Sequence, residues 1–324
     1  MTAERTRDGV ITFAGQDWWY HGQAHCDFQV SRHLAEQLPV LVVNSIGMRM
    51  PTASNADAVW SRIWRKAKST LRYLRRPDPA ASPRMWVMTP VSVPVFGNER
   101  ARRWNARFVA LQVRAVARCV ARIRQPTVIV VVPTALDVVH ALGEPVSVYY
   151  RADDHAATDG VDHDLIFGLE SQLMTEATVT CWSSRALMDA EAGRPCRQRM
   201  LLDHGVEVDH FDRDRVAARP EPAAVAGIAH PRIGFFGQIE NESIDADLLA
   251  RLAALPGAQL VMIGRVAMDL SAIEHLPNVH LLGWQAYAEL PALAAGFDVA
   301  ICPMPATDLV RAANPIKIKE YLSL

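Results

Sequence analysis

Short aliphatic runs alternate with segments of helical periodicity along most of the chain. Strands of a parallel sheet are buried on both faces, so they read as continuous aliphatic runs, with a helix in each connection. The alternation therefore predicts an α/β protein made of repeated βα units. The strands expected in the first part of the chain are Val10–Phe13, Val40–Asn44, Trp86–Thr89, Val128–Val132, Ser147–Tyr150 and Thr178–Trp182.

The chain is long enough for two such domains, because 324 residues exceed the usual size of a single hydrophobic core. We predict a Rossmann-like domain over residues 1–208, a linker rich in Ala, Pro and charge over 209–231, and a second Rossmann-like domain over 232–324. The last helix reaches Leu324 without a Gly or Asn cap, so the second domain is expected to be incomplete. Its expected strands are Ile233–Phe236, Gln259–Ile263, Val279–Leu282 and Val299–Pro303, and its expected helices are Ala246–Leu255 and Tyr287–Ala294.

Charge and cysteine content limit the compartment and the partners. The formal net charge is −1, yet Asp78 and Glu99 are the only acidic residues between Trp60 and Arg124. The five cysteines lack paired metal-type spacing, which favours a reduced, cytoplasmic protein. The N-terminus is polar rather than apolar, and no aliphatic run is long enough to cross a bilayer. Any membrane contact is therefore expected to be peripheral, on the inner face of the plasma membrane.

The segment Asn314–Leu322 carries the clearest binding signal. Asn314 followed by Pro315 is a typical helix start, because Asn can cap the first backbone donors and Pro already holds the helical φ. Unpaired N–H groups and the positive end of the helix dipole can hold a diphosphate, and Lys317 adds charge. Glu320 lies on the same face and can accept both hydroxyls of a ribose. An ordinary surface helix of a Rossmann-like domain is the alternative.

Several stretches taken together carry a family likeness. They are Asn314–Leu322, Leu276–Gly283, Gly234–Gly237, Gly296–Ala300, Tyr149–Asp154, Ser183–Arg185 and His204–Phe211. On these residues the chain resembles the retaining GT-B glycosyltransferases of the family 4 type, in particular a branch from bacterial polysaccharide gene clusters. The resemblance implies two Rossmann-like domains facing across a cleft, a nucleotide-sugar held mainly by the second domain, no metal, and ribose binding by Glu320. It also implies retention, by attack on the face that the diphosphate leaves, which needs positive charge on the leaving group.

Two departures from that family's pattern affect the donor site. Many relatives carry a second Glu at the position of Ala312, and many carry Arg and Lys in the loop that here reads Gln238–Glu242. The charge that neutralises the diphosphate is therefore expected from Arg265, Arg311 and Lys317. Arg265 follows Gly264 at a strand end, where open α/β sheets bind ligands, although a solvated loop arginine is an equal alternative. The expected donor-binding residues are Asn314, Pro315, Lys317, Glu320, Arg265, Arg311 and Gly237.

An acidic cluster follows the predicted strand Ser147–Tyr150. Asp153, Asp154 and His155 should emerge at the carboxyl edge of the sheet, where a carboxylate can accept the proton of an attacking alcohol. Asp153 and Asp154 are therefore our catalytic candidates, and an acidic helix start is the alternative. Residues 162–164 read Asp-His-Asp, a pattern that can hold a divalent cation, but the following leucines favour an ordinary helix start, so no metal site is expected.

The acceptor side is expected around the loop after the first strand. Residues 15–22 are dense in aromatic and polar groups, which can stack on a sugar and bond its hydroxyls. Asp17, Trp18, His21 and Arg151 are the acceptor-side candidates, although packing of Trp18 and Trp19 against the next helix is the alternative for at least one of them.

Two basic helices are expected between the first strands. Over residues 60–76, apolar positions at helical spacing are flanked by Arg and Lys, which favours either contact with an anionic membrane that carries a lipid-linked acceptor or a solvated basic face. No motif supports nucleic-acid binding. In the second helix, the stripe Trp104, Phe108, Leu111 and Ala115 is expected to pack in the core.

These features predict a glycosyltransferase that moves a sugar from a nucleotide-sugar to a glycan or lipid-linked acceptor, with no other cofactor. A sugar-nucleotide epimerase on the same architecture and a non-catalytic partner in a polysaccharide assembly complex are the alternatives. A nicotinamide oxidoreductase is disfavoured because neither domain opens with a Gly-x-Gly-x-x-Gly turn.

Overall fold

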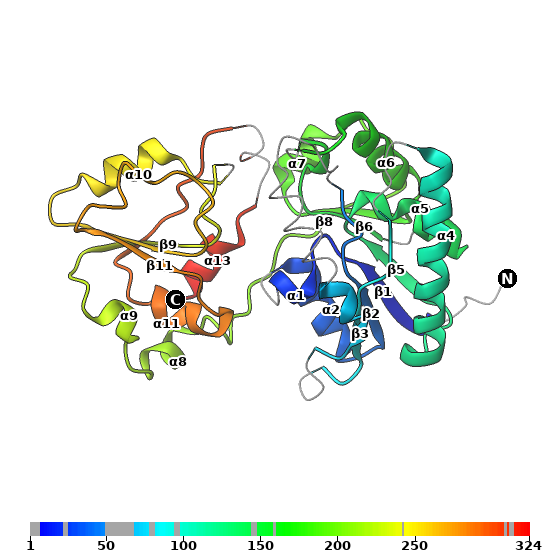
Figure 1. Ribbon diagram of the computed structural model, residues 1–324, viewed down its shortest axis with the longest axis horizontal. Coiled ribbons are helices and arrows are strands. Elements are labelled where there is room, and N and C mark those ends of the chain that lie inside the picture. The colour runs from blue at the N-terminus through cyan, green and yellow to red at the C-terminus, as the bar shows by residue number, and fades with distance from the viewer. Residues whose placement is uncertain are drawn as a thin grey trace. The chain divides into compact units, whose positions relative to one another are not determined.

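The computed structural model describes residues 7–21, 25–48, 68–77, 82–93, 98–143, 148–157, 160–241, 243–307, 310 and 314–324. The chain divides into two compact units, Met1–Asp203 and His204–Leu324. In each unit, helices pack against a central β-sheet (Figure 1). Both units therefore have the α/β architecture that the alternating pattern predicts.

The first unit contains an eight-stranded sheet in the order β3-β4-β2-β1-β5-β6-β7-β8. All neighbouring strands in it are parallel except the antiparallel pair β3 and β4. Strands β1 and β2 are buried at every position, because helices cover both faces of a parallel sheet. The strands are β1 Gly9–Phe13, β2 Val40–Val43, β3 Leu74–Arg75, β4 Met85–Met88, β5 Pro126–Val130, β6 Val148–Arg151, β7 Val179–Trp182 and β8 Arg199–Leu201.

Helices connect these strands, and three of them begin at a side-chain cap. Asn98 caps α4, Asp162 caps α6 and Ser184 caps α7, each by accepting hydrogen bonds from backbone N–H groups of the first turn. The helices are α1 Trp18–His21, α2 Cys26–Ala35, α4 Glu99–Val116, α5 Leu136–Leu142, α6 His163–Glu176 and α7 Arg185–Ala190.

The second unit contains a four-stranded parallel sheet in the order β11-β10-β9-β12. From β9 the chain builds the sheet first toward β10 and β11 on one side and then places β12 on the other side. In open α/β sheets, ligands bind outside the carboxyl ends of the strands where the strand order changes direction in this way. Its core is apolar and includes Phe235, Leu249 and Met262. The elements are α8 Arg213–Ala217, α9 Ala223–Ala226, β9 Arg232–Phe236, α10 Ala246–Ala253, β10 Gln259–Ile263, β11 Val279–Gly283, α11 Leu290–Ala294, β12 Val299–Ala300 and α13 Ile316–Ser323.

The unit boundary differs from the sequence expectation. It falls between Asp203 and His204, and residues 209–231 belong to the second unit, where they form α8 and α9. Phe211 and Val225 are fully buried there beside Phe236. The sequence predicts a linker here because these two helices are too short to show apolar periodicity.

The sequence missed two strands, β3 and β8. Both lie at the edges of the first sheet and are short, so neither carries a long aliphatic run. The strand expected at Val299–Pro303 is also shorter, because only Val299 and Ala300 pair with β9.

The two basic helices also differ from expectation. Residues 60–67 of the first lie outside the described residues; 68–71 are helical, but Leu74 and Arg75 form β3 because the edge of β4 offers a pairing partner. In α4, the core face consists of Ala106, Val109, Ala110, Val113 and Val116. The residues Trp104, Phe108 and Leu111, which we call the α4 stripe, are exposed, so the expectation that they pack in the core is wrong.

Candidate functional site

Two glycines shape the carboxyl edge of the second sheet. Gly237 follows β9 with φ of 146° and Gly264 follows β10 with φ of 148°, conformations that L side chains rarely adopt. A Cβ on Gly264 would lie 1.7 Å from the carbonyl oxygen of Gly237, and a Cβ on Gly237 would lie 2.3 Å from Cε of Lys317. Glycine is therefore required at both strand ends. The sequence prediction included Gly237 but missed Gly264, although a glycine directly after a strand was a usable signal.

Helix α13 starts beside these glycines. It begins at Ile316, and the N-cap position is Pro315 in an extended conformation, without a hydrogen bond from a capping side chain. The prediction that Asn314 caps this helix is therefore wrong by one position. Pro315 carries no side-chain acceptor, so the N-cap residue itself does not cap the first-turn backbone donors, which suits an anion-binding helix start.

Three contacts fix α13 to its own unit. The hydroxyl of Tyr321 accepts a hydrogen bond from the backbone N–H of Phe236 at 3.1 Å, and the two rings pack edge to face at 4.9 Å. Lys319 Nζ donates to the carbonyl oxygen of His204 at 2.5 Å. These contacts set the position of the side chains that α13 carries.

Glu320 and Lys317 lie on the buried side of α13. Glu320 is only 5% exposed, and Lys317 Nζ lies 5.6 Å from the ring centroid of Phe235. Burial raises the pKa of Glu320 to about 7; the charge of Lys317 opposes this rise and that of Glu207 adds to it. A buried carboxylate of this kind gains most from a ligand that donates hydrogen bonds.

The remaining donor-side candidates are less defined. Arg265 is exposed on the loop after β10, and its carbonyl oxygen accepts from the N–H of Ile239, which joins this loop to the one after β9. Its role toward a diphosphate stays a prediction. Arg311 lies outside the described residues.

The second unit also has a cavity of about 620 Å³. It lies beside Arg213, Phe297 and Leu324, and neither Lys317 nor Glu320 lines it. We place the candidate site by its chemistry, at the strand ends, and assign no ligand to this cavity.

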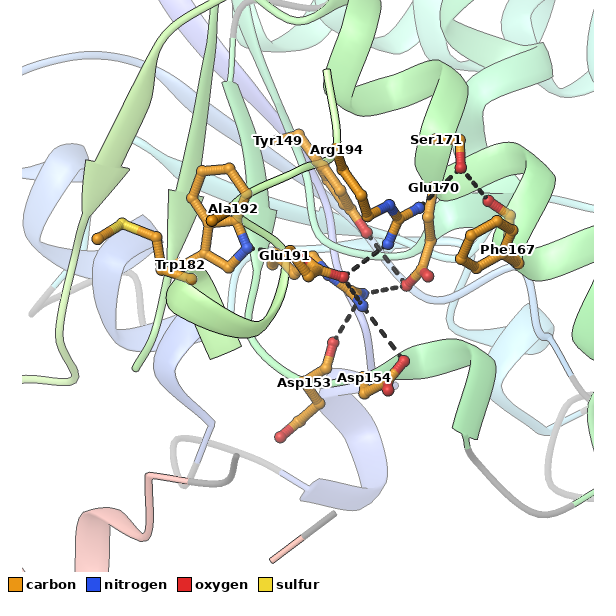
Figure 2. A network of polar contacts seen from close by, with 12 residues as sticks. Tyr149, Asp153, Asp154, Phe167, Glu170, Ser171, Trp182, Glu191, Ala192 and Arg194 are labelled. Atoms are coloured by element: carbon orange, nitrogen blue, oxygen red, sulfur yellow. Dashed lines mark hydrogen bonds and ion pairs between the residues drawn. The ribbon is translucent and has the colours of Figure 1, made fainter. Parts of the chain in front are cut away.

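In the first unit, Arg151 ends β6 and organises the acidic loop that follows it. Figure 2 shows its partners Asp153, Asp154, Glu170 and Glu191. Its Nε donates to both oxygens of Glu191 at 2.9 and 2.8 Å, and Nη2 donates to Glu191 at 2.6 Å and to the Asp154 carboxylate at 3.2 Å. Nη1 donates to the Asp153 carbonyl at 3.0 Å and to the Glu170 carboxylate. All five N–H donors are engaged and Arg151 is 1% exposed, so the acceptor-side assignment of this residue is wrong.

The surrounding residues extend this network. Trp182 Nε1 and Arg194 Nη1 donate to Glu191 at 2.7 and 2.6 Å. Burial raises the pKa of Glu191, but the hydrogen bond and charge of Arg151 outweigh it, so the net shift is downward. Burial raises the pKa of Glu170 to about 7, against the opposing charge of Arg151. The network couples β6, α6 and the residues after α7 to the acidic loop.

The two catalytic candidates differ in their surroundings. The carboxylate of Asp154 is paired with Arg151. Asp153 contacts Arg151 only through its backbone carbonyl oxygen in the described contacts, and Asp153 is exposed. Asp153 is thus the better placed of the two to accept a proton from a ligand.

His155 lies next to them and is buried. Its ring hydrogen-bonds to the backbone of Val131, and its Nε2 has no partner among the described residues. Burial and the charge of Arg151 lower the pKa of His155 to about 4, so the ring is neutral at pH 7.

The loop after β1 is mainly structural. Trp18 is buried and packs edge to face on Phe28 at 4.9 Å. Asp17 accepts from the N–H of Trp19 at 3.0 Å and from the hydroxyl of Ser69 at 2.5 Å. Trp18 therefore has a packing role, as the alternative allowed, whereas Asp17 is half-buried and its acceptor-side assignment stays a prediction. The backbone of His21 ends α1, and its side chain lies outside the described part of the chain.

Sequence reasoning missed the buried acids, namely Glu170 and Glu191 around Arg151, and Asp27. Asp27, in the first turn of α2, accepts from the N–H of Gly15 at 2.9 Å, and burial raises its pKa to about 6. An acid in a first turn is common, so nothing in the sequence distinguished it.

No metal-type cluster appears among the described residues. Asp162 caps α6 by accepting from the N–H of Leu165 at 3.1 Å, and His163 and Asp164 are exposed. In the described part of the chain, no group of three or more His, Cys, Asp or Glu side chains could hold a metal ion. Within the same residues, no helix is both long and apolar enough to cross a membrane.

Comparison with solved structures identifies the fold. The chain is similar to sucrose-phosphate synthase from Thermosynechococcus elongatus, at 11% identity and a TM-score of 0.63 over 92% of this chain and 76% of that chain. The fold is GT-B. It is also similar to Anabaena Alr3699/HepE in complex with UDP-glucose (14% identity, TM-score 0.57, 94% and 77% covered) and to a trehalose-phosphate synthase from Burkholderia vietnamiensis (12%, 0.53, 98% and 81%). No family model and no curated protein matches the sequence.

Arg151→Met is expected to destabilise the first unit by about 3–5 kcal/mol, because it leaves Glu170 buried without its cation and Glu191 with Arg194 alone. Arg151→Lys should be nearly as severe, since one ammonium cannot replace a forked guanidinium. Urea unfolding followed by tryptophan fluorescence measures both. The matched control is Arg185→Met, at an exposed position, and equal midpoints for Arg151→Met and this control would contradict the assigned role.

Glu320→Gln is expected to stabilise the protein at pH 8 and to change its stability little at pH 4. The pKa of Glu320 rises from an ordinary 4.5 to about 7 on folding. The folded state therefore binds more protons between these values, and the wild type loses stability as pH rises through that window. Gln stays neutral throughout. Urea unfolding between pH 4 and 8 measures the difference, with exposed Glu289→Gln as control; a pH-independent difference would refute the assignment.

Proposed function

We propose that this chain is a glycosyltransferase that moves a sugar from a nucleotide-sugar donor to a glycan or lipid-linked acceptor in polysaccharide biosynthesis. The observation that carries the proposal is the group at the start of α13. Gly237 and Gly264 bring two strand ends into close contact beside Lys317, and Glu320 lies one turn further along the helix. Structures of the similar protein Alr3699/HepE contain UDP and UDP-glucose, so a UDP-hexose is the first donor class to test.

The donor would bind mainly to the second unit. Its diphosphate would lie at the start of α13, where Pro315 ends the preceding extended segment and Lys317 supplies positive charge. The carboxylate of Glu320 would accept the ribose hydroxyls. Arg265 and Arg311 would add charge to the leaving group, which a retaining transfer without a strong enzymic nucleophile requires.

The acceptor would react at the carboxyl edge of the first unit. Asp153 would accept the proton of the attacking hydroxyl, while Arg151 holds the loop through its carbonyl oxygen and through the carboxylate of Asp154. We propose that transfer needs no metal and that the protein is cytoplasmic with a peripheral contact to an anionic membrane.

Glu320→Gln is expected to weaken donor binding about tenfold or more at pH 8, because a neutral amide replaces the carboxylate that accepts two hydroxyls. The wild-type affinity should fall as pH drops below about 7, where Glu320 becomes protonated. Calorimetry and thermal shift with UDP-, GDP- and dTDP-sugars measure both effects.

Glu289→Gln, at an exposed position of the same unit, is the control and should bind as the wild type does. The opposite directions of the Glu320→Gln effects, on stability and on binding, separate a ligand-binding carboxylate from a structural one. Absence of binding with every nucleotide-sugar would contradict the proposed function.

Asp153→Asn is expected to lower turnover by about 100-fold and to leave donor affinity within twofold, because only the proton acceptor is lost. Asp154→Asn should have a smaller effect, since an amide oxygen can still accept from Arg151. Sugar transfer is measured in excess EDTA, where full activity is expected. Wild-type rates in both variants, or activity that requires added metal, would overturn this assignment, and donor conversion without any acceptor would indicate an epimerase.

A further inference from the structure

The α4 stripe is an apolar surface that the fold leaves uncovered. Trp104, Phe108 and Leu111 recur at positions i, i+4 and i+7, on the side of the helix opposite its buried face, and Trp104 is 73% exposed. Figure 1 shows α4 as a long helix beside α5. Contiguous exposed apolar residues on one helix face indicate an interaction surface.

A neighbouring segment widens this surface. The backbone N–H and carbonyl of Val91 bond to the Gln112 side chain at 3.0 and 2.8 Å, and the N–H of Val93 donates to Asn105 at 2.9 Å. These bonds hold the segment along α4, and both valine side chains are exposed. The apolar surface therefore spans two elements of the fold.

Arginines border the stripe. Between residues 98 and 124 the chain has eight arginines and one acidic residue, Glu99. Arg102 pairs with Asp137 and Arg103 with Glu99, each at 2.5 Å, and Arg114 bonds to carbonyl groups at the end of α5. The other five are exposed and form no ion pair within the described residues: Arg100 and Arg107 lie on α4, and Arg118, Arg122 and Arg124 follow its C-terminal end.

Trp104, the first residue of the stripe, lies toward the same sheet edge as the acidic loop. Helix α4 connects β4 to β5, and both strands run parallel within one sheet, so α4 leads back from the carboxyl edge of the sheet. Trp104 is near the start of α4, roughly 9 Å along it at 1.5 Å per residue. Asp153 and Asp154 leave the sheet at this carboxyl edge.

We propose that the α4 stripe and its arginines dock this protein on an anionic bilayer surface. Trp104, Phe108 and Leu111 enter the headgroup region, and the unpaired arginines contact lipid phosphates. A surface with arginines and almost no acids complements an anionic membrane better than a mixed-charge protein surface. This proposal rests on the proposed function in one respect only, which is that the membrane would carry the lipid-linked acceptor.

Sedimentation with vesicles tests the surface without donor or transfer, so its failure leaves the transferase proposal intact. The wild type is expected to bind phosphatidylglycerol vesicles at low salt and not pure phosphatidylcholine vesicles. Trp104→Ala should weaken binding roughly tenfold, and a triple Arg100→Gln, Arg107→Gln, Arg118→Gln variant about 100-fold, at about fivefold per basic residue. Brominated phosphatidylglycerol should quench tryptophan emission of the wild type, and Trp104→Phe should bind but lose most of this quenching.

The matched controls lie in the second unit. Trp284 is 63% exposed, and Trp284→Ala should bind vesicles as the wild type does. The charge control is an Arg213→Gln, Arg251→Gln double variant, at two exposed positions. Absence of vesicle binding at low salt, or equal losses in the stripe and control variants, would overturn the proposal. So would self-association that Trp104→Ala abolishes while vesicles fail to bind, which would assign the stripe to a second copy of the chain.

Discussion

Parallel pairing places the carboxyl ends of neighbouring strands at one edge of a sheet, and both candidate sites depend on this constraint. Of the strand pairs that the structure describes, only β3 and β4 are antiparallel. Loops that are far apart in the sequence therefore meet, as the loops after β9 and β10 do through the backbone bond between Ile239 and Arg265. Each unit can then build a site from residues that carry no local signal of proximity.

The two units build their sites by different physical means. In the second unit, Gly237 and Gly264 have no side chain, so the two strand ends can approach each other closely. The lack of a Cβ on Gly237 also leaves room for Lys317 at the start of α13. The first unit uses buried charge. Arg151 compensates two buried glutamates and holds the acidic loop through Asp153 and Asp154. A buried ion network of this kind contributes more to position than to stability, because desolvation offsets much of its electrostatic gain.

Burial of the Glu320 carboxylate lowers the stability of the folded protein at a pH where the group is charged. The helix that carries it is anchored by Tyr321 and Lys319, and the Glu320 side chain is buried in that position. Its raised pKa is the sign that the folded protein alone does not satisfy its charge. A ligand that donates hydrogen bonds removes this deficit, which is why such positions are common at functional sites.

Much of the architecture could be predicted from the sequence alone. The aliphatic runs determine the parallel strands, as Gln259–Ile263 shows, because burial on both faces demands that composition. The sequence also predicts Lys317 and Glu320 at one helix start, since helix starts have local chemical signals, whereas only the structure brings Gly237 next to Lys317. It did not reveal edge strands such as β8, whose formation depends on a partner strand rather than on their own composition.

Only the tertiary structure decided which side chains are free to act. Arg151 and Trp18 read as binding residues, yet the neighbours that bury them come from distant segments. The spacing of the α4 stripe predicts a core face, but the small residues on the opposite side of the helix are the buried ones, beside α5, and Trp104 stays outside. Periodicity determines that a helix has distinct faces; which of them is buried depends on the surfaces that the rest of the chain presents.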